Sequence, residues 1–155
     1  MAEKLSTGLR NEMVGPGGQS MADALEYGVI RIYSGPQPGT ADAAETGTLL
    51  VEITLASAAS TDPMTSGNGL SFQTAVDGSS PKTAAEVWSG VGVAAGTAGW
   101  FRFYDLDYDL GASTTAIRFD GNIAPSGSDM DMTNTAIAVG GTTTLDSGSI
   151  TIPAS

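Results

Sequence analysis

The stretch Gly28–Leu55, GVIRIYSGPQPGTADAAETGTLLVEITL, decides the fold class of this chain. Two runs of alternating side chains, Val29–Tyr33 and Thr48–Leu55, flank a loop of Gly, Pro, Ala, Thr and acidic residues. Successive side chains of a strand point to opposite faces, so alternation at period two indicates half-buried strands. In the second run the large apolar residues share one face, and only Leu50 breaks the pattern.

The composition points the same way. The chain has 155 residues, which fits one domain, with 21 glycines and only 15% charged residues. A helical protein of this length would carry more Leu, Glu, Lys and Arg. We therefore predict a mainly β fold, an antiparallel β-sandwich or jelly-roll-like barrel of about eight strands with one short N-terminal helix. Residues 1–19 are predicted to form an N-terminal arm, and residues 20–155 a single β-domain.

Turn signals set the expected element bounds, Asp120-Gly121-Asn122 being one of them. The expected strands cover residues 29–34, 48–56, 69–76, 86–94, 98–106, 114–120, 135–139 and 144–152. Ser20–Tyr27 is predicted to be the helix, capped by Ser20 with Asp23 and ended by Gly28 in the left-handed conformation.

The predicted arm has one apolar stripe. Leu5, Leu9 and Met13 recur at helical spacing, and Gly15-Pro16-Gly17-Gly18 ends any helix that follows them. A short arm with one stripe cannot fold alone, so the stripe needs a surface on its own domain or on a neighbouring subunit. These three residues are candidate interface residues.

The segment Gly99–Tyr104, GWFRFY, is the aromatic centre of the sequence. Alternation predicts a central strand with Phe101 and Phe103 in the core and the other side chains on the opposite face. Trp100 beside Arg102 could instead form a cation–π contact at a subunit interface, where Trp, Tyr and Arg are enriched. Trp100 and Arg102 are therefore also candidate interface residues.

Charge limits the possible partners. Seventeen acids against six bases give a formal net charge of −11, and the bases are scattered. Phosphate surfaces are bound by clustered Lys and Arg, so we expect neither nucleic acid nor anionic membrane as a partner. We interpret the acidity chiefly as a source of solubility. The N-terminus lacks the apolar core of a secretory signal, so no export by that route is expected.

Three alternate aspartates, Asp105, Asp107 and Asp109, resemble the start of a calcium loop. The rest of that template fails, because Leu110 stands at its glycine position and Ala116 at its final glutamate position. Strand alternation alone would leave all three in solvent. They are weak candidates for metal ligands, and no bound metal or cofactor is expected.

Catalytic templates fit poorly. The sequence has no histidine and no cysteine, which excludes Ser-His-Asp and Cys-His nucleophile systems and His- or Cys-ligated zinc. Carboxylates such as Glu52, Glu86 and Asp105 could in principle act as an acid–base pair, but no motif isolates two of them. We predict that the chain is not an enzyme and that no residue is catalytic.

Several segments in order resemble a family of small structural proteins encoded among the head and tail genes of tailed bacteriophages. These segments are Thr7-Gly8-Leu9-Arg10-Asn11, Gly28–Ser34 (GVIRIYS), Pro38, Ala41-Asp42-Ala43-Ala44, Gly47-Thr48-Leu49-Leu50, Ala98–Tyr104 (AGWFRFY), Asp120-Gly121-Asn122, Gly127–Met132 (GSDMDM), Asn134-Thr135, Ile137-Ala138 and Ser149–Pro153 (SITIP). They span most of the chain and are structural rather than catalytic.

The resemblance implies a virion protein, made in the cytoplasm of the bacterial host. The first expectation is a capsid decoration (cement) protein on the outside of the phage head. It would bind the major capsid protein or other virion proteins and form a homo-oligomer, with a trimer favoured. The alternative is a tail, baseplate or fibre-associated module that binds another tail protein or a host glycan, and exposed Trp88, Trp100, Tyr104 or Tyr108 would be its signature.

Overall fold

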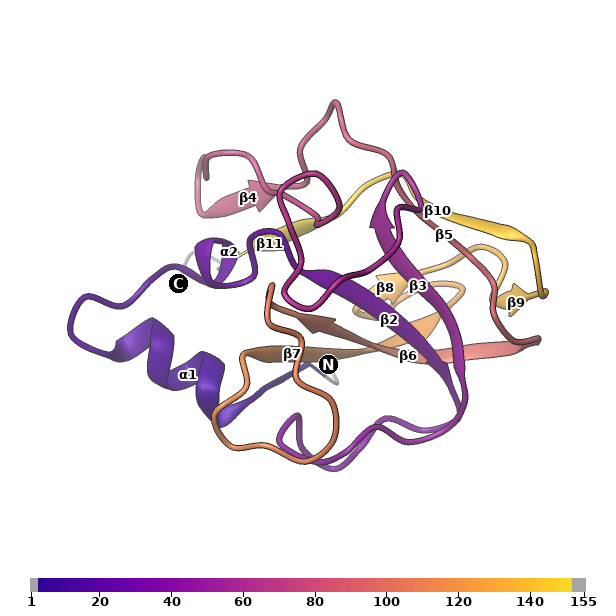
Figure 1. The fold of residues 1–155 in the computed structure, drawn as a ribbon, viewed down its shortest axis with the longest axis horizontal. Coiled ribbons are helices and arrows are strands. Elements are labelled where there is room, and N and C mark those ends of the chain that lie inside the picture. Colours follow the sequence, from indigo (N-terminus) through magenta and orange to yellow (C-terminus); the bar gives the residue numbers. More distant parts are fainter. Residues whose placement is uncertain (1–2, 152–155) are drawn as a thin grey trace.

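The computed structural model describes residues 3–151, and these are mainly β with two short helices (Figure 1). The helices are α1 (Thr7–Val14) and α2 (Met21–Ala24). The strands are β1 (Lys4–Leu5), β2 (Val29–Ser34), β3 (Leu49–Leu55), β4 (Ser79–Pro81), β5 (Trp88–Val91), β6 (Gly96–Tyr104), β7 (Arg118–Ala124), β8 (Met130–Asp131), β9 (Ala136–Ile137), β10 (Thr142–Leu145) and β11 (Ser149–Thr151). Within the described residues, no helix is long and apolar enough to cross a bilayer.

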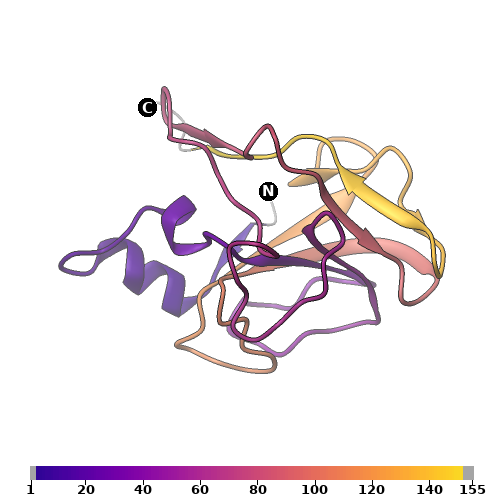
Figure 2. The ribbon, with the colours of Figure 1, turned by 45° about the horizontal axis from the view of Figure 1, so that its top comes forward.

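The strands form one large sheet and one small one. The large sheet has the order β1-β7-β6-β2-β3-β5-β10, with β8 paired to β7 and β9 paired to β6, and the small sheet pairs β11 with β4. All pairs are antiparallel except β7 with β8. Figure 2 shows the β4–β11 pair on one side of the large sheet. The prediction of a mainly β, antiparallel, sandwich-like fold is confirmed. The two large sheets of a jelly roll are not seen, because the second described sheet has only two strands.

Alternation gives the large sheet two chemically different faces. In β6, Phe101 and Phe103 join the main apolar core, as predicted, and Ile30 and Ile32 of β2 pair with them across the sheet. The residues between them, including Arg102, point to the other face, which is polar and aromatic. One face of the sheet is therefore apolar and the other carries polar and aromatic side chains.

Leu50, the residue that breaks the alternation of β3, marks a β-bulge. Ile32 pairs with Val51 and Tyr33 with Leu49, so Leu50 is the extra residue of the strand. A bulge places two successive residues against one on the partner strand. This allows both Leu50 and Val51 to be fully buried.

The described part of the predicted arm packs on the domain. β1 pairs with β7, and Leu9 on α1 is fully buried. Ser6 caps α1 by accepting a hydrogen bond from the Leu9 N–H, and its Oγ also accepts one from the backbone N–H of Arg118 at 3.0 Å. Of the two surfaces considered for the apolar stripe, the chain's own domain therefore receives Leu9.

The predicted helix at 20–27 is shorter than expected. Ser20 caps it as predicted, accepting from the Asp23 N–H at 3.1 Å, but helical structure ends at Ala24. The left-handed residue is Tyr27 rather than Gly28. A Cβ at Gly28 would lie 2.0 Å from the backbone oxygen of Tyr104, so this glycine is required by the close approach of β6.

Three predicted strands are wrong in position or existence. Residues 69–76 form only isolated bridges, and the backbone N–H groups of Ser71 and Phe72 donate to the Glu86 and Glu26 carboxylates instead of to a neighbouring strand. The strand expected at 114–120 begins at Arg118 and runs through the supposed turn at Asp120-Gly121-Asn122. The strand expected at 144–152 is two strands, β10 and β11, and residue 152 lies outside the described residues.

Candidate functional site

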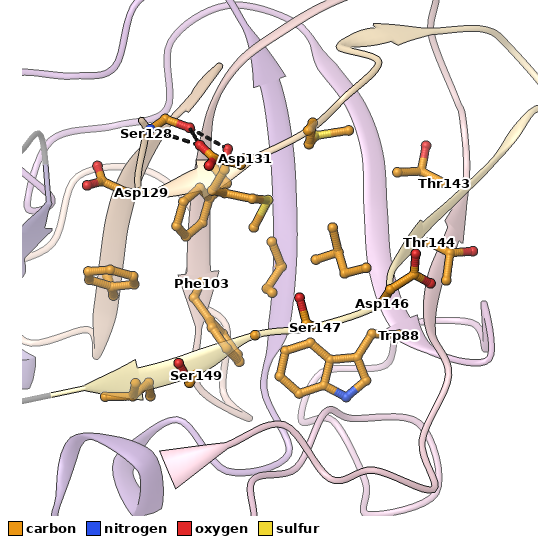
Figure 3. A pocket seen from close by; sticks show the side chains of 18 of the residues that line it. Trp88, Phe103, Ser128, Asp129, Asp131, Thr143, Thr144, Asp146, Ser147 and Ser149 are labelled. Carbon is orange, nitrogen blue, oxygen red and sulfur yellow. Dashed lines mark hydrogen bonds between the residues drawn. The ribbon is translucent and has the colours of Figure 1, made fainter. Parts of the chain in front are cut away.

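A groove of about 770 Å³ opens on the apolar face of the large sheet (Figure 3). This volume is within the roughly 300–1,000 Å³ range of protein ligand sites. Its floor is made by side chains of β2, β5, β6 and β7 that belong to the main core or pack against it: Ile30, Trp88, Phe101, Phe103 and Phe119.

Ring contacts hold this floor rigid. Phe101 and Phe119 pack edge to face with centroids 5.7 Å apart, and Trp88 and Phe103 do so at 6.3 Å. The Trp88 indole N–H also donates to the Glu86 carboxylate at 2.7 Å, which fixes the orientation of the ring. The apolar floor is therefore preorganised.

The walls come from the last quarter of the described chain. One wall is the 128–134 segment that contains β8, and another is the continuous segment 142–151 that contains β10 and β11. Figure 3 shows the chain from Asp146 to Ser149 crossing in front of the central strands. This second layer covers the sheet only in part, so the groove is the uncovered remainder of the sandwich interior.

The rim of the groove is acidic. Glu3, Asp129, Asp131 and Asp146 line it, and no Lys or Arg is among the described lining residues. Figure 3 places Asp129 and Asp131 across the groove from Asp146, with Phe103 between them. Partial burial and the charge of Asp129 raise the pKa of Glu3 above its ordinary value. The groove therefore combines an apolar floor with negative charge at its edges.

Two rim carboxylates are held in place by the β7–β8 connection. Asp129 Oδ2 accepts from the Asn122 N–H at 2.9 Å, and the Asp129 N–H donates to Asn122 Oδ1 at 3.0 Å. Asp131 Oδ1 accepts from both the N–H and the hydroxyl of Ser128, and these bonds lower the Asp131 pKa. The acidic rim is thus a fixed feature of the fold.

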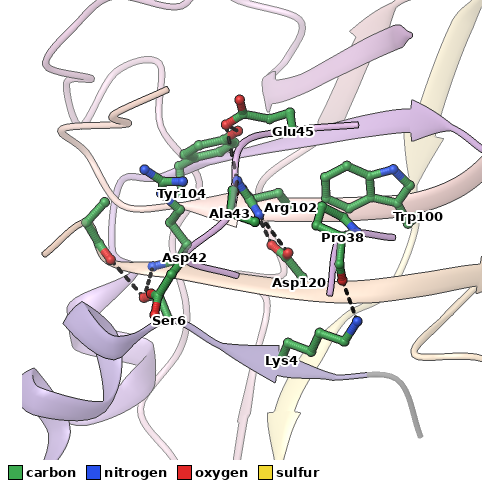
Figure 4. A network of polar contacts seen from close by, with 12 residues as sticks. Lys4, Ser6, Pro38, Asp42, Ala43, Glu45, Trp100, Arg102, Tyr104 and Asp120 are labelled. Atoms are coloured by element: carbon green, nitrogen blue, oxygen red, sulfur yellow. Dashed lines mark hydrogen bonds and ion pairs between the residues drawn. The ribbon is translucent and has the colours of Figure 1, made fainter. Parts of the chain in front are cut away.

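The opposite face of the sheet carries a buried polar network (Figure 4). Arg102 donates through Nε and Nη2 to the two carboxylate oxygens of Asp120, at 2.6 and 2.8 Å, and both side chains are fully buried. Arg102 Nη1 also reaches the Ala43 carbonyl and Glu45. Burial acts to lower the pKa of Arg102, but its bonds to Asp120 outweigh burial and raise the pKa above its ordinary value.

Glu45 connects this network to two loops. Its carboxylate accepts from the Tyr104 hydroxyl at 2.6 Å and from the Gly111 N–H at 3.0 Å. Burial alone would raise the Glu45 pKa, but these bonds and the charge of Arg102 hold it below its ordinary value. The network therefore fastens the 35–48 and 105–117 loops to the sheet, and its role is structural.

The predicted interface residues divide between interior and surface. Trp100 and Arg102 lie in the interior, beneath the 35–48 loop, where Trp100 donates to the Thr46 carbonyl. The Arg102 guanidinium lies 5.5 Å from the Trp100 ring centroid, so the expected cation–π contact exists but within one chain. Leu5 and Met13 are half-buried, and Leu5 lines the groove.

The three alternate aspartates do not form a metal site in the described residues, among which no group of three or more His, Cys, Asp or Glu side chains could hold an ion. Asp105 is half-buried, whereas Asp107 and Asp109 are exposed. Burial, together with the charges of Asp107 and Asp109, raises the pKa of Asp105 to about 7.

Two of the three carboxylates considered for acid–base chemistry, Glu52 and Glu86, have structural partners, whereas Asp105 lies beside Asp107 and Asp109. Glu52 forms an ion pair with Arg31, and Glu86 accepts from Ser71 and Trp88. The charge of Glu86 also helps to raise the pKa of the neighbouring Glu26, after burial as the main cause. The groove itself offers shape, apolar surface and charge.

Little in the amino-acid sequence indicates this groove. Its walls come from 128–134 (SDMDMTN) and from 142–151, where Ser, Thr and Gly dominate, and neither segment contains a catalytic or metal motif. Asp129 and Asp131 belong to no complete metal-ligand motif. The useful signal was the combination of Met130 and Met132 with these acids, since apolar and acidic residues that alternate can place one kind inward and the other at a rim.

No protein-family profile, no curated protein and no solved structure matches this chain.

Proposed function

We propose that this chain is a non-enzymatic structural protein of a tailed-phage virion that decorates the outside of the head. The observation that carries the proposal is the groove, which has a packed apolar floor and an acidic rim, on a scaffold in which Glu52 and Asp120 are paired with arginines. The sequence resemblance supplies the virion context, and the groove supplies a surface for another protein.

The fold suits such a role. A decoration protein must persist outside the cell. This chain has no cysteine, so its stability there must come from packing and polar contacts rather than from disulfides. The Arg102–Asp120 pair and the Glu45 bonds tie long loops onto the sheet, which limits local opening. The proposed partner is the major capsid protein or another virion protein, and the proposed assembly is a closed homo-oligomer, with a trimer favoured.

The contact surface we propose differs from a detached arm. Because β1 and α1 pack on the domain, the groove and its rim take the place of residues 1–19 as the docking surface. The alternative, a tail or fibre module that binds glycan, needs exposed aromatic rings on which sugars can stack. Trp88 is 3% exposed, Trp100 and Tyr104 are 0% exposed and Tyr108 is half-buried, so three of the four predicted rings are covered, which favours the decoration role.

The test compares particles from the intact genome that encodes this chain with particles from the same genome lacking the gene. We expect the chain in purified virions, antibody labelling over the head in electron micrographs, and lower heat resistance of heads without it. Adding the purified protein to deficient heads should restore the resistance. Absence from purified virions would refute the virion role, and labelling confined to the tail would favour the alternative.

A further inference from the structure

We propose that the groove binds an extended segment of a partner polypeptide, which adds to β10 as a further strand. Apolar side chains at alternate positions of that segment would rest on the aromatic floor, and Lys or Arg residues near its ends would meet the acidic rim. The inference names the partner chemistry of the groove and rests on the proposed function only in requiring a protein partner.

The first observation is the free edge of β10. β10 pairs with β5 through Thr142–Leu145 and is the last strand of the large sheet on that side. An edge strand presents unpaired backbone N–H and C=O groups, to which an extended peptide can bind. All four residues of β10 also line the groove, so a strand added there would run along it.

The second observation is the shape and chemistry of the floor. The second layer of the sandwich is incomplete over Phe119, which is half-buried and lines the open volume of about 770 Å³, whereas Phe101 and Phe103 also line it but are each only 4% exposed. In a strand every second side chain faces the same way, so a peptide held by β10 would direct alternate residues toward this floor. Apolar residues at those positions would bury against rings that are already ordered.

The third observation is charge complementarity. Asp146 lies at one side of the groove, Asp129 and Asp131 lie at the other, and Glu3 adds a fourth carboxylate. The described lining residues include no base, and the charge of Asp129 disfavours ionisation of Glu3. A cationic side chain would relieve this repulsion, whereas an acidic peptide would increase it.

The experiment uses the whole chain and three synthetic nonapeptides. The probe is KVTVSVTVK, which alternates apolar and polar residues between terminal lysines. EVTVSVTVE reverses the charge, and KVVTSTVVK keeps the composition but breaks the alternation. We expect KVTVSVTVK to bind at least tenfold more tightly than either control by fluorescence anisotropy. We also expect it to protect backbone amides within Thr142–Leu145 from hydrogen exchange, which binding elsewhere would not do.

Two pairs of variants locate the binding. Ala136 is exposed and lines the groove, so Ala136→Trp should abolish binding by filling it, while Ala112→Trp in the 105–117 loop should not. Asp146→Asn should weaken binding about two- to fivefold, the range for one exposed ion pair, while Asp109→Asn should change it less. The exchange measurement on the unaltered chain decides the question even if Ala136→Trp fails to fold.

Several results would overturn the proposal. Equal affinity for the three peptides would do so, as would binding without protection of β10 amides. Uptake of octyl glucoside with none of the peptides would show a site for small apolar molecules, and self-association abolished by Ala136→Trp would show a site for a second copy. Peptide binding without head association would refute the proposed function alone, and head association that survives Ala136→Trp would refute this inference alone.

Discussion

The Arg102–Asp120 pair allows a quantitative test of how the polar face is held together. Asp120→Ala removes the carboxylate that accepts two hydrogen bonds from Arg102, at 2.6 and 2.8 Å, and leaves a guanidinium that is 0% exposed. The Ala43 carbonyl and the Glu45 carboxylate remain within reach of Nη1, but Nε and Nη2 lose their partners. The variant therefore leaves two buried hydrogen-bond donors without acceptors and much of a buried positive charge uncompensated.

The expected cost follows from that geometry. Breaking a buried ion pair by removing one partner destabilises a protein by about 3–5 kcal/mol, and the remaining contacts of Arg102 place the expected value near about 3 kcal/mol. For a domain of this size that loss lowers Tm by roughly 6–12 °C, at about 2–4 °C per kcal/mol. Replacing both residues, as Arg102→Met with Asp120→Leu, removes both charges of this pair and leaves Glu45 its bonds to Tyr104 and Gly111, so it should cost less than Asp120→Ala alone.

Urea unfolding followed by tryptophan fluorescence measures these free energies. Asp146→Asn is the control, because it removes one negative charge from an exposed position and should change stability by no more than about 0.5 kcal/mol. A cost below about 1 kcal/mol for Asp120→Ala would refute the reasoning. So would a double variant less stable than the single one, since the penalty would then lie in lost attraction rather than in an unpaired charge.

Three further predictions test other parts of the fold. The pKa of Asp105 is raised to about 7, against an ordinary value of about 3.9. The folded chain therefore binds this proton more tightly than the unfolded chain does. The stability that proton binding contributes is lost as pH rises from about 4 through 7. Asp105→Asn should therefore stabilise the chain at pH 8 and have progressively less stabilising effect toward pH 5, as measured by thermal melts across pH. Gly28→Ala should destabilise by about 1–3 kcal/mol in urea, because its Cβ would lie 2.0 Å from the Tyr104 oxygen. Deleting residues 1–19 should abolish cooperative unfolding in calorimetry, since it removes buried Leu9; a sharp transition near the original Tm would show that the segment is dispensable.

Strict alternation made the centre of the sheet predictable. The pattern of β2, β3 and β6 in the sequence matches their observed bounds within two residues, and it assigned Phe101 and Phe103 to the core. Each of these strands has one apolar face, and a one-residue slip would expose all of it. Even the irregular Leu50 had structural meaning, because a bulge was the way to bury it next to Val51.

Turn chemistry misled where packing requires a small residue inside a strand. Asp120-Gly121-Asn122 reads as a turn, yet it lies within β7. A Cβ at Gly121 would come within 2.5 Å of the Phe101 ring, so the glycine is there for close approach to the aromatic floor. Asp120 is a strand residue because Arg102 on β6 lies directly opposite it. Both requirements come from a neighbouring strand, and local sequence does not contain them.

The groove could not be predicted because its residues lie far apart in the sequence. Its floor comes from strands spread between residues 30 and 119, and its walls come from short elements after residue 128. Segments rich in Ser, Thr and Gly have no strong period, so neither their pairing nor the gap they leave follows from their sequence. Only the three-dimensional arrangement shows that the second layer is incomplete.

The positions of the six bases show where the net charge of −11 is locally balanced and where it is not. Arg31 pairs with Glu52 and Arg102 with Asp120, while Lys4 and Arg118 donate to backbone carbonyls of the loops on the polar face. None of the bases lines the groove. The described groove lining therefore holds acids and no base, although Lys82 Nζ lies 5.7 Å from the Trp88 ring centroid, and association with a basic segment there should slow as ionic strength rises. A groove with an apolar floor and only acids among its described charged lining residues therefore suits a basic segment better than an acidic one.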